Sequence, residues 1–178
     1  MILAAAASLA VVQPVPQPVE PPLPPPGRTT LEISRDPIDD SVRAFVVYRS
    51  GEARLTVGCN RDRFDGVRVA LWDAGWFAPR FFVGRRSVRY RFDAARPRST
   101  LWRADEGAVY LRGRSRVRGF LRWLAASQSF AIRAKDVEDR RREFVFSTAG
   151  SRPQIEGMLE ACGETRLREA IAAGSGGG

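Results

Sequence analysis

Apolar residues alternate with polar ones along most of this chain, and this period of two constrains its fold more than any other feature. Residues 53–59, 67–71 and 88–92 each place an apolar side chain at every second position, which is typical of a strand with one buried face. Further segments of strand composition lie at residues 42–49, 100–103, 108–112, 130–134 and 143–147. The sequence therefore predicts a mainly β (α+β) fold, an antiparallel β-sandwich or rolled sheet of about eight strands.

Two segments change to helical spacing. The first carries its apolar residues at intervals of three and four, at Val117, Phe120, Leu121 and Leu124. The second begins near Ser151, which suits an N-cap, and has Pro153 in its first turn. We expect both helices to pack on the apolar face of the sheet.

The 178 residues suit one folded domain, which we place at residues 31–163. Residues 1–12 are apolar or small and too few to span a bilayer, which needs about 20; they resemble a secretory signal that lacks its basic start. Residues 13–30 form a linker rich in proline, which favours an extended polyproline II spacer. Residues 164–178 are expected to form a short helix and a flexible glycine-rich tail.

The chain contains no histidine and only two cysteines. It therefore has no Ser-His-Asp or Cys-His nucleophile, no histidine zinc site and no four-thiolate metal site. We expect a protein that is not an enzyme and has no cofactor and no metal. The remaining acidic cluster, Asp36, Asp39 and Asp40, suits either a hard cation and a hydrolase or a simple turn before a strand.

Cys59 falls on a predicted strand and Cys162 on the second predicted helix, both on core-facing positions. In an exported protein this arrangement predicts a structural disulfide. In a reducing compartment the two residues would instead be buried free thiols.

Positive charge is concentrated in one part of the chain, whose net charge is +9. Residues 80–122 contain thirteen arginines and three acids. The arginines expected to form one basic surface are Arg85, Arg86, Arg89, Arg91, Arg112, Arg114, Arg116 and Arg118. Such a surface would attract phosphate or carboxylate polymers in a salt-dependent way. An arginine-biased composition, in which Lys135 is the only lysine, is the alternative explanation.

Residues 72–82 bring five aromatic rings together around a glycine and a proline. If exposed, Trp72, Trp76, Phe77 and Arg80 would form a docking surface rich in tryptophan and arginine. If buried, the rings would cover an open end of the sheet.

Several of these features occur in a recognisable order, from the Asp36 turn and the Cys59 strand through the triplet Arg91-Phe92-Asp93 and Trp102 to Cys162. This order resembles the small periplasmic domain of the type VI secretion-associated VasI family and related proteobacterial exported proteins of unknown function. The resemblance implies an exported, disulfide-bonded accessory or interaction module and transfers no catalytic residue. The triplet and Trp102 are expected to be structural, with Arg91 and Asp93 on the outward face in an ion pair within the strand or with a neighbour, and with Phe92 in the core.

Together these observations predict a non-enzymatic periplasmic or secreted binding domain without a transmembrane span. Its partner would be an envelope protein or an anionic envelope component, contacted through the aromatic loop around Trp76 and the basic surface. The alternative is a cytosolic basic protein that binds nucleic acid through the face from Arg85 to Arg118.

Overall fold

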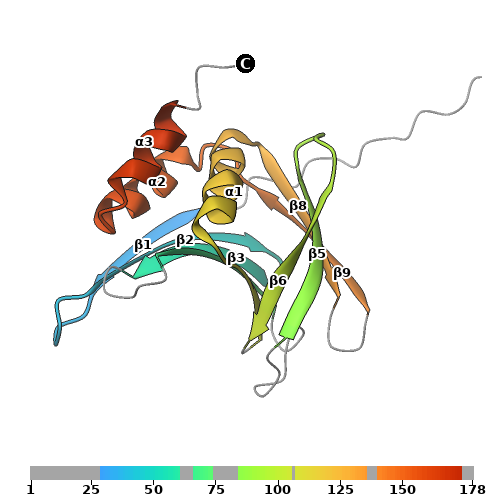
Figure 1. The fold of residues 1–178 in the computed structure, drawn as a ribbon, viewed down its shortest axis with the longest axis horizontal. Coiled ribbons are helices and arrows are strands. Elements are labelled where there is room, and N and C mark those ends of the chain that lie inside the picture. The colour runs from blue at the N-terminus through green and yellow to red at the C-terminus, as the bar shows by residue number, and fades with distance from the viewer. Residues whose placement is uncertain (1–28, 61–65, 74–83, 106, 136–139, 174–178) are drawn as a thin grey trace, which may run out of the picture.

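A computed structural model describes residues 29–60, 66–73, 84–105, 107–135 and 140–173. These residues form one antiparallel sheet of nine strands and three helices (Figure 1). The strands are β1 (Thr30–Arg35), β2 (Val42–Ser50), β3 (Ala53–Asn60), β4 (Val67–Trp72), β5 (Gly84–Phe92), β6 (Arg98–Asp105), β7 (Ala108–Leu111), β8 (Ser129–Lys135) and β9 (Arg141–Ser147). The helices are α1 (Arg114–Ala126), α2 (Arg152–Ala161) and α3 (Thr165–Ala173).

The sheet is strongly rolled. Its strand order is β1-β2-β3-β4-β7-β6-β5-β8-β9, and β9 nevertheless contacts β2 near the opposite end of that order. At the end of β4, the Oδ2 atom of buried Asp73 lies 3.7 Å from Nε of Arg142 on β9. The predicted mainly β fold with a rolled antiparallel sheet is therefore confirmed.

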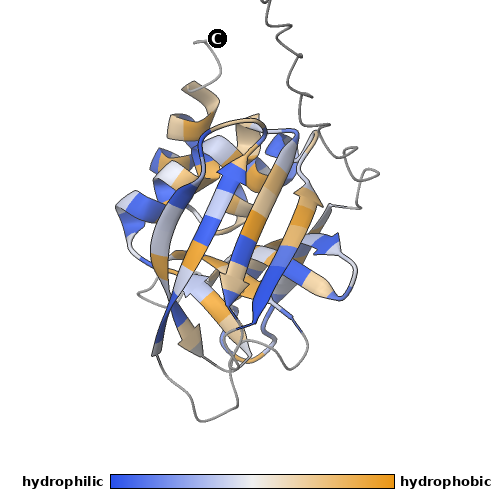
Figure 2. Ribbon diagram, turned by 90° about the vertical axis from the view of Figure 1, so that its right-hand side faces the viewer, coloured by the Kyte–Doolittle hydropathy of each residue, from blue (hydrophilic) through white to orange (hydrophobic). Residues whose placement is uncertain are grey.

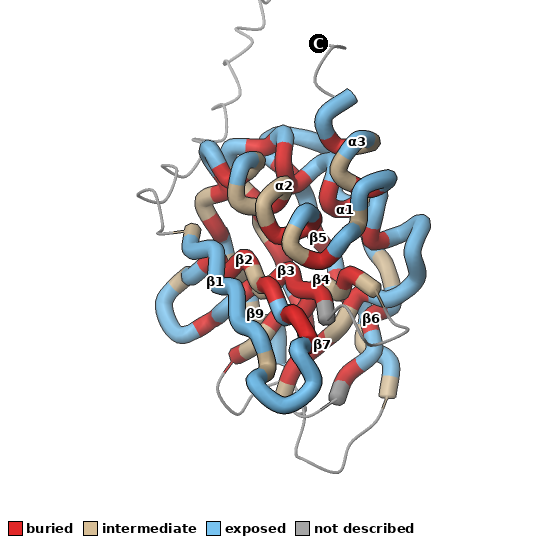
Figure 3. The backbone as a smooth tube through the Cα atoms, turned by 90° about the vertical axis from the view of Figure 1, so that its left-hand side faces the viewer, coloured by how far each residue is buried: buried red, intermediate tan, exposed pale blue. Residues whose placement is uncertain are grey.

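The hydrophobic core fills the concave side of the sheet beneath the helices (Figure 3). Its centre is an aromatic cluster in which Phe130 and Phe120 lie 5.2 Å apart between ring centroids and Tyr90 lies 5.5 Å from Phe120. Helix α1 buries the four apolar residues expected from its spacing, and α3 buries Leu167 and Ile171. The helices thus close the concave side and leave the convex side free of them (Figure 1).

The strands expected from the sequence correspond to β2 through β9, with ends that differ by at most two residues except at β5, which begins four residues earlier than expected. The additional strand, β1, is exposed at all six positions, and its apolar alternation is limited to two residues, Leu31 and Ile33. Helix α2 begins after Ser151 as expected, although the Ser151 side chain makes no capping hydrogen bond. In the part of the chain that the structure describes, no helix combines the length and apolar character that crossing a membrane requires. The signal-like segment and the proline-rich residues 13–28 lie outside the described residues.

Candidate functional site: the arginine-rich outer face

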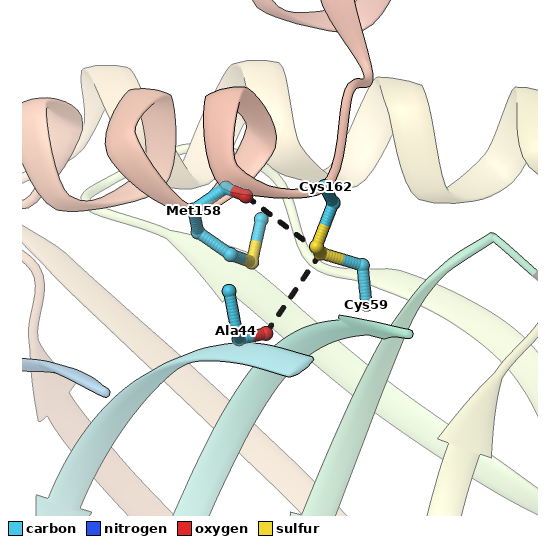
Figure 4. Close-up of a disulfide and its surroundings, with 4 residues drawn as sticks. All are labelled: Ala44, Cys59, Met158 and Cys162. Atoms are coloured by element: carbon cyan, nitrogen blue, oxygen red, sulfur yellow. Dashed lines mark hydrogen bonds between the residues drawn. A yellow bond between two sulfur atoms is a disulfide. The ribbon is translucent and has the colours of Figure 1, made fainter. Parts of the chain in front are cut away.

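The two cysteines form a disulfide in the core (Figure 4). Cys59 of β3 and Cys162 at the end of α2 are separated by 103 positions in sequence, and their Cα atoms lie 6.3 Å apart. The Cys59 sulfur is 3.8 Å from the carbonyl oxygen of Ala44 and 3.7 Å from that of Met158. Because a disulfide sulfur carries no proton, these are sulfur–oxygen contacts and not donated hydrogen bonds. The predicted pairing is confirmed, and it fastens α2 to the sheet.

The convex side of β2 through β9, which we call the outer face, is strongly basic. Its side chains alternate along each strand with those of the core, as the hydrophilic and hydrophobic positions in Figure 2 show for one side of the molecule. The cations at these outward positions are Arg43, Arg49, Arg54, Arg68, Arg85, Arg89, Arg91, Arg103, Arg133, Lys135 and Arg141. Among the described side chains of this face the one carboxylate is Glu143, which is paired with Arg133.

A groove of about 880 Å³ lies on this face between β6 and the start of α1. It forms because β7 leaves β6 early: β7 pairs with β6 only from Arg103 to Asp105, while β5 pairs with β6 from Arg98 to Ala104. The chain then turns into α1 at Gly113, whose φ of 96° is accessible to glycine but not to most other residues. The groove is lined by Gly84, Arg85, Ser87, Ser99, Thr100, Leu101, Arg103, Tyr110, Arg112 and Arg116.

The charge of this β6–α1 groove is entirely positive among its lining residues. Arg85 and Arg103 face each other across the β5–β6 pair, and Arg112 and Arg116 stand on the opposite side. Arg85, Arg112 and Arg116 make no ion pair with any carboxylate that the structure describes. The groove is therefore suited to an anionic ligand, whose charge would meet guanidinium groups from both sides.

An aromatic floor adjoins the groove. A second depression of about 310 Å³ has Phe45, Gly58, Trp72 and Tyr110 among its lining residues, with Arg43 and Arg68 beside them. The rings of Trp72 and Tyr110 meet edge to face with centroids 5.9 Å apart. Tyr110 lines both depressions, so the arginine groove and the aromatic floor adjoin at this residue. The sequence shows that Phe45 and Trp72 are apolar residues at outward positions of their strands. Alternation alone does not show that such residues lie together in one site.

The structure separates the arginines that the sequence grouped together. Arg85 and Arg89 are exposed on the outer face. Arg86 has the inward parity of Val88, and its Nε atom is buried, so its inclusion in the basic surface was wrong. Arg114 and Arg118 are exposed on α1 but do not line the groove.

Of the aromatic loop, the structure describes only the first residues. Trp72 is half-buried on the outer face at the end of β4. Trp76, Phe77 and Arg80 lie outside the described residues.

The triplet that carries the family resemblance has a structural role, with one correction. Phe92 and Trp102 are buried as expected. Asp93 follows the end of β5 in a left-handed conformation, φ 46°. Its Oδ1 atom accepts hydrogen bonds from the backbone N–H groups of Gln128 and Ser129 at 2.9 and 2.8 Å. The predicted Arg91–Asp93 ion pair is therefore absent among the described residues, because the carboxylate turns toward the start of β8.

The acidic cluster builds a turn. The Oδ1 atom of Asp36 accepts from the N–H of Ile38, and that of Asp39 accepts from the N–H of Ser41, both at 2.9 Å. Hydrogen bonding from Ser41, first from its side chain and then from its backbone, lowers the pKa of Asp39. Asp40 lies 3.6 Å from Arg35. In the described part of the chain, these carboxylates do not gather into a group of three or more metal ligands.

In comparisons with known proteins, no family model, no curated protein and no solved structure matches this chain.

Proposed function

We propose that this protein is a non-enzymatic binding domain of the periplasm or the extracellular space, and that its outer face contacts an anionic component or protein of the cell envelope. The observation that carries the proposal is the concentration of arginine on one side of the sheet, opposite the helices and the core. Positive charge gathered on one face raises the local concentration of anionic partners and speeds their association.

The disulfide supports the extracytoplasmic location. Disulfides persist in oxidising compartments and are rare in the cytosol. The apolar segment at residues 1–12 agrees with export. The most specific version of this proposal is a role in type VI secretion. It is supported by the order of sequence features that resembles the VasI family.

The second candidate is nucleic-acid binding. It is favoured by the contact between Trp72 and Tyr110 next to Arg68 and Arg43, because single strands bind surfaces that combine arginine with aromatic rings. We rank it second because the disulfide favours a compartment without nucleic acid.

The test measures both the redox state of the two cysteines and the binding of the protein to isolated envelopes. Protein taken from its native host without reductant should contain no free thiol, and it should be retained on isolated envelopes of that host in a salt-sensitive way. Replacing Arg89 and Arg91 together by glutamine should weaken this retention several-fold, whereas the same change at Arg118 and Arg122 on α1 should have little effect. Two free thiols together with salt-sensitive binding to single-stranded DNA would reject the proposal in favour of the second candidate.

A further inference from the structure

The β6–α1 groove contains an open strand edge. Among the described strands, β6 pairs with β5 alone from Arg98 to Trp102, and its pairing with β7 is limited to Arg103–Asp105. In a strand with one neighbour, alternate backbone N–H and C=O groups point away from that neighbour. The open edge of β6 therefore presents hydrogen-bonding groups at the spacing of an extended peptide.

The groove has room beside this edge. On α1, Arg116 lines the groove and Trp123 contacts Arg98 of β6, so Gly119 between them belongs to the same side of the helix. A Cβ atom added at Gly119 would meet nothing within 4 Å. Helix α1 therefore does not fill the space along the edge.

Two contacts connect β6 to its surroundings near the groove. Beyond the lining residues, the guanidinium carbon of Arg98 lies 5.0 Å from the ring centroid of Trp123, a cation–π contact that joins β6 to α1. Within the groove, Arg103 pairs with Tyr110 of β7. Leu101, which also lines the groove, is 54% exposed and offers an apolar contact.

We infer that the β6–α1 groove binds an extended acidic segment of a partner protein, which adds as a strand to the open edge of β6 while Arg85, Arg112 and Arg116 bind its carboxylates. This inference rests on the proposed binding function and names the class of its partner. Strand addition draws affinity from main-chain hydrogen bonds and specificity from alternate side chains. Guanidinium groups bind carboxylates in a bidentate manner, which selects acidic sequences.

Two other occupants fit less well. The proline-rich residues 13–27 of this chain contain a single acid, Glu20, and proline has no N–H for a ladder. A small anion such as phosphate would satisfy the arginines but would leave the strand edge without partners.

The probe is an eight-residue peptide of alternating glutamate and valine with blocked ends. It is compared with the same peptide methylated on alternate backbone nitrogens and with tripolyphosphate. Binding is measured by calorimetry to the full oxidised chain, and hydrogen exchange of the amides from Arg98 to Trp102 reports on pairing at the edge. The test variant combines Arg112→Gln and Arg116→Gln. The matched control combines Arg118→Gln and Arg122→Gln, which removes the same amount of charge from positions on α1 outside the groove.

We expect the unmodified peptide to bind and to slow exchange at the β6 edge. Each lost charge-assisted hydrogen bond is worth about a tenfold change in affinity, so the test variant should bind at least ten times more weakly. The control variant should bind within about threefold of the parent protein, because surface charges outside the site contribute little.

Four results would overturn the inference. Equal binding of the methylated peptide would exclude strand addition, and equal losses in both variants would exclude the groove. Binding of tripolyphosphate without the peptide would assign the groove to a small anion. If no probe binds while envelope retention still depends on Arg89 and Arg91, the inference fails and the proposed function stands. Loss of that retention, with free thiols, rejects the proposed function itself.

Discussion

The ring of Phe45 rests on Gly58 of the neighbouring strand, which leaves no room there for a side chain. A Cβ atom at Gly58 would lie 2.2 Å from Cδ1 of Phe45. Gly58→Ala should therefore displace the ring and lower the free energy of unfolding by about 1–3 kcal/mol, the usual cost of overpacking. Urea unfolding measures this change.

The control is the same substitution in a Phe45→Ala background. Without the ring, alanine at position 58 should stabilise the strand by roughly 0.5–1 kcal/mol relative to glycine, because it restricts the unfolded chain more. If Gly58→Ala lowered the free energy of unfolding equally in both backgrounds, the contact with Phe45 would not be the cause of the destabilisation.

Tyr48 gives the protein a sensitivity to alkaline pH. Its side chain is 1% exposed, and burial raises its pKa above the ordinary value. Burial also raises the pKa of Tyr90, against a smaller opposing effect of Arg98. Since the unfolded chain then loses these protons first, stability is fully present below about pH 10, the unfolded tyrosine pKa, and falls as pH rises above it.

We expect the free energy of unfolding to fall above pH 10 by up to about 1.4 kcal/mol per pH unit for each such tyrosine. Tyr48→Phe should remove the part of this decrease that Tyr48 causes, so the free energy of unfolding of the variant should fall less steeply with pH. The chain has one lysine, so few other side chains titrate in this range. Urea unfolding at several pH values from 9 to 11 measures both slopes, and identical slopes would contradict the assignment.

At the scale of elements, the disulfide joins parts of the fold that are far apart in sequence. A cross-link between residues 103 positions apart stabilises by about 4.7 kcal/mol in the chain-entropy model. Reduction should therefore lower the free energy of unfolding by about 3–5 kcal/mol, as should the double variant Cys59→Ala with Cys162→Ala. Unfolding of the oxidised, reduced and variant proteins in urea tests this expectation. A difference below about 1 kcal/mol would mean that packing alone holds α2 on the sheet.

Sequence periodicity predicted the elements better than the site. Alternation located β2 through β9 because each buries one face, whereas in β1 it is limited to Leu31 and Ile33, too few residues to single out a strand. The groove depends on where β7 leaves β6, and this divergence follows from strand pairing that no local pattern records. Arg85 and Arg86 are adjacent in sequence but do not share a surface, because neighbours on a strand point to opposite faces.

At the scale of the whole molecule, the fold places the hydrophobic core and most of the charged strand residues on opposite sides of the sheet. The helices and the disulfide lie on the concave side, and most cations of the strands lie on the convex side, Arg86 and Arg98 being exceptions. A rolled sheet produces this separation directly, because alternate residues of every strand have only these two sides to occupy. The arrangement of charge should therefore matter for binding in addition to its amount.

Elution from immobilised heparin, used as a general polyanion, distinguishes these two contributions. Arg89→Glu with Arg91→Glu on the outer face, and Arg118→Glu with Arg122→Glu on α1, lower the net charge of +9 by the same amount. We expect the outer-face variant to elute at clearly lower salt, since exposed charges more than about 10 Å from the contact are largely screened at 0.1 M salt. Both variants should keep the parent thermal stability, because all four side chains are exposed. Equal shifts in elution would mean that binding to the polyanion depends on net charge alone. That result would contradict the assignment of the outer face as the contact surface.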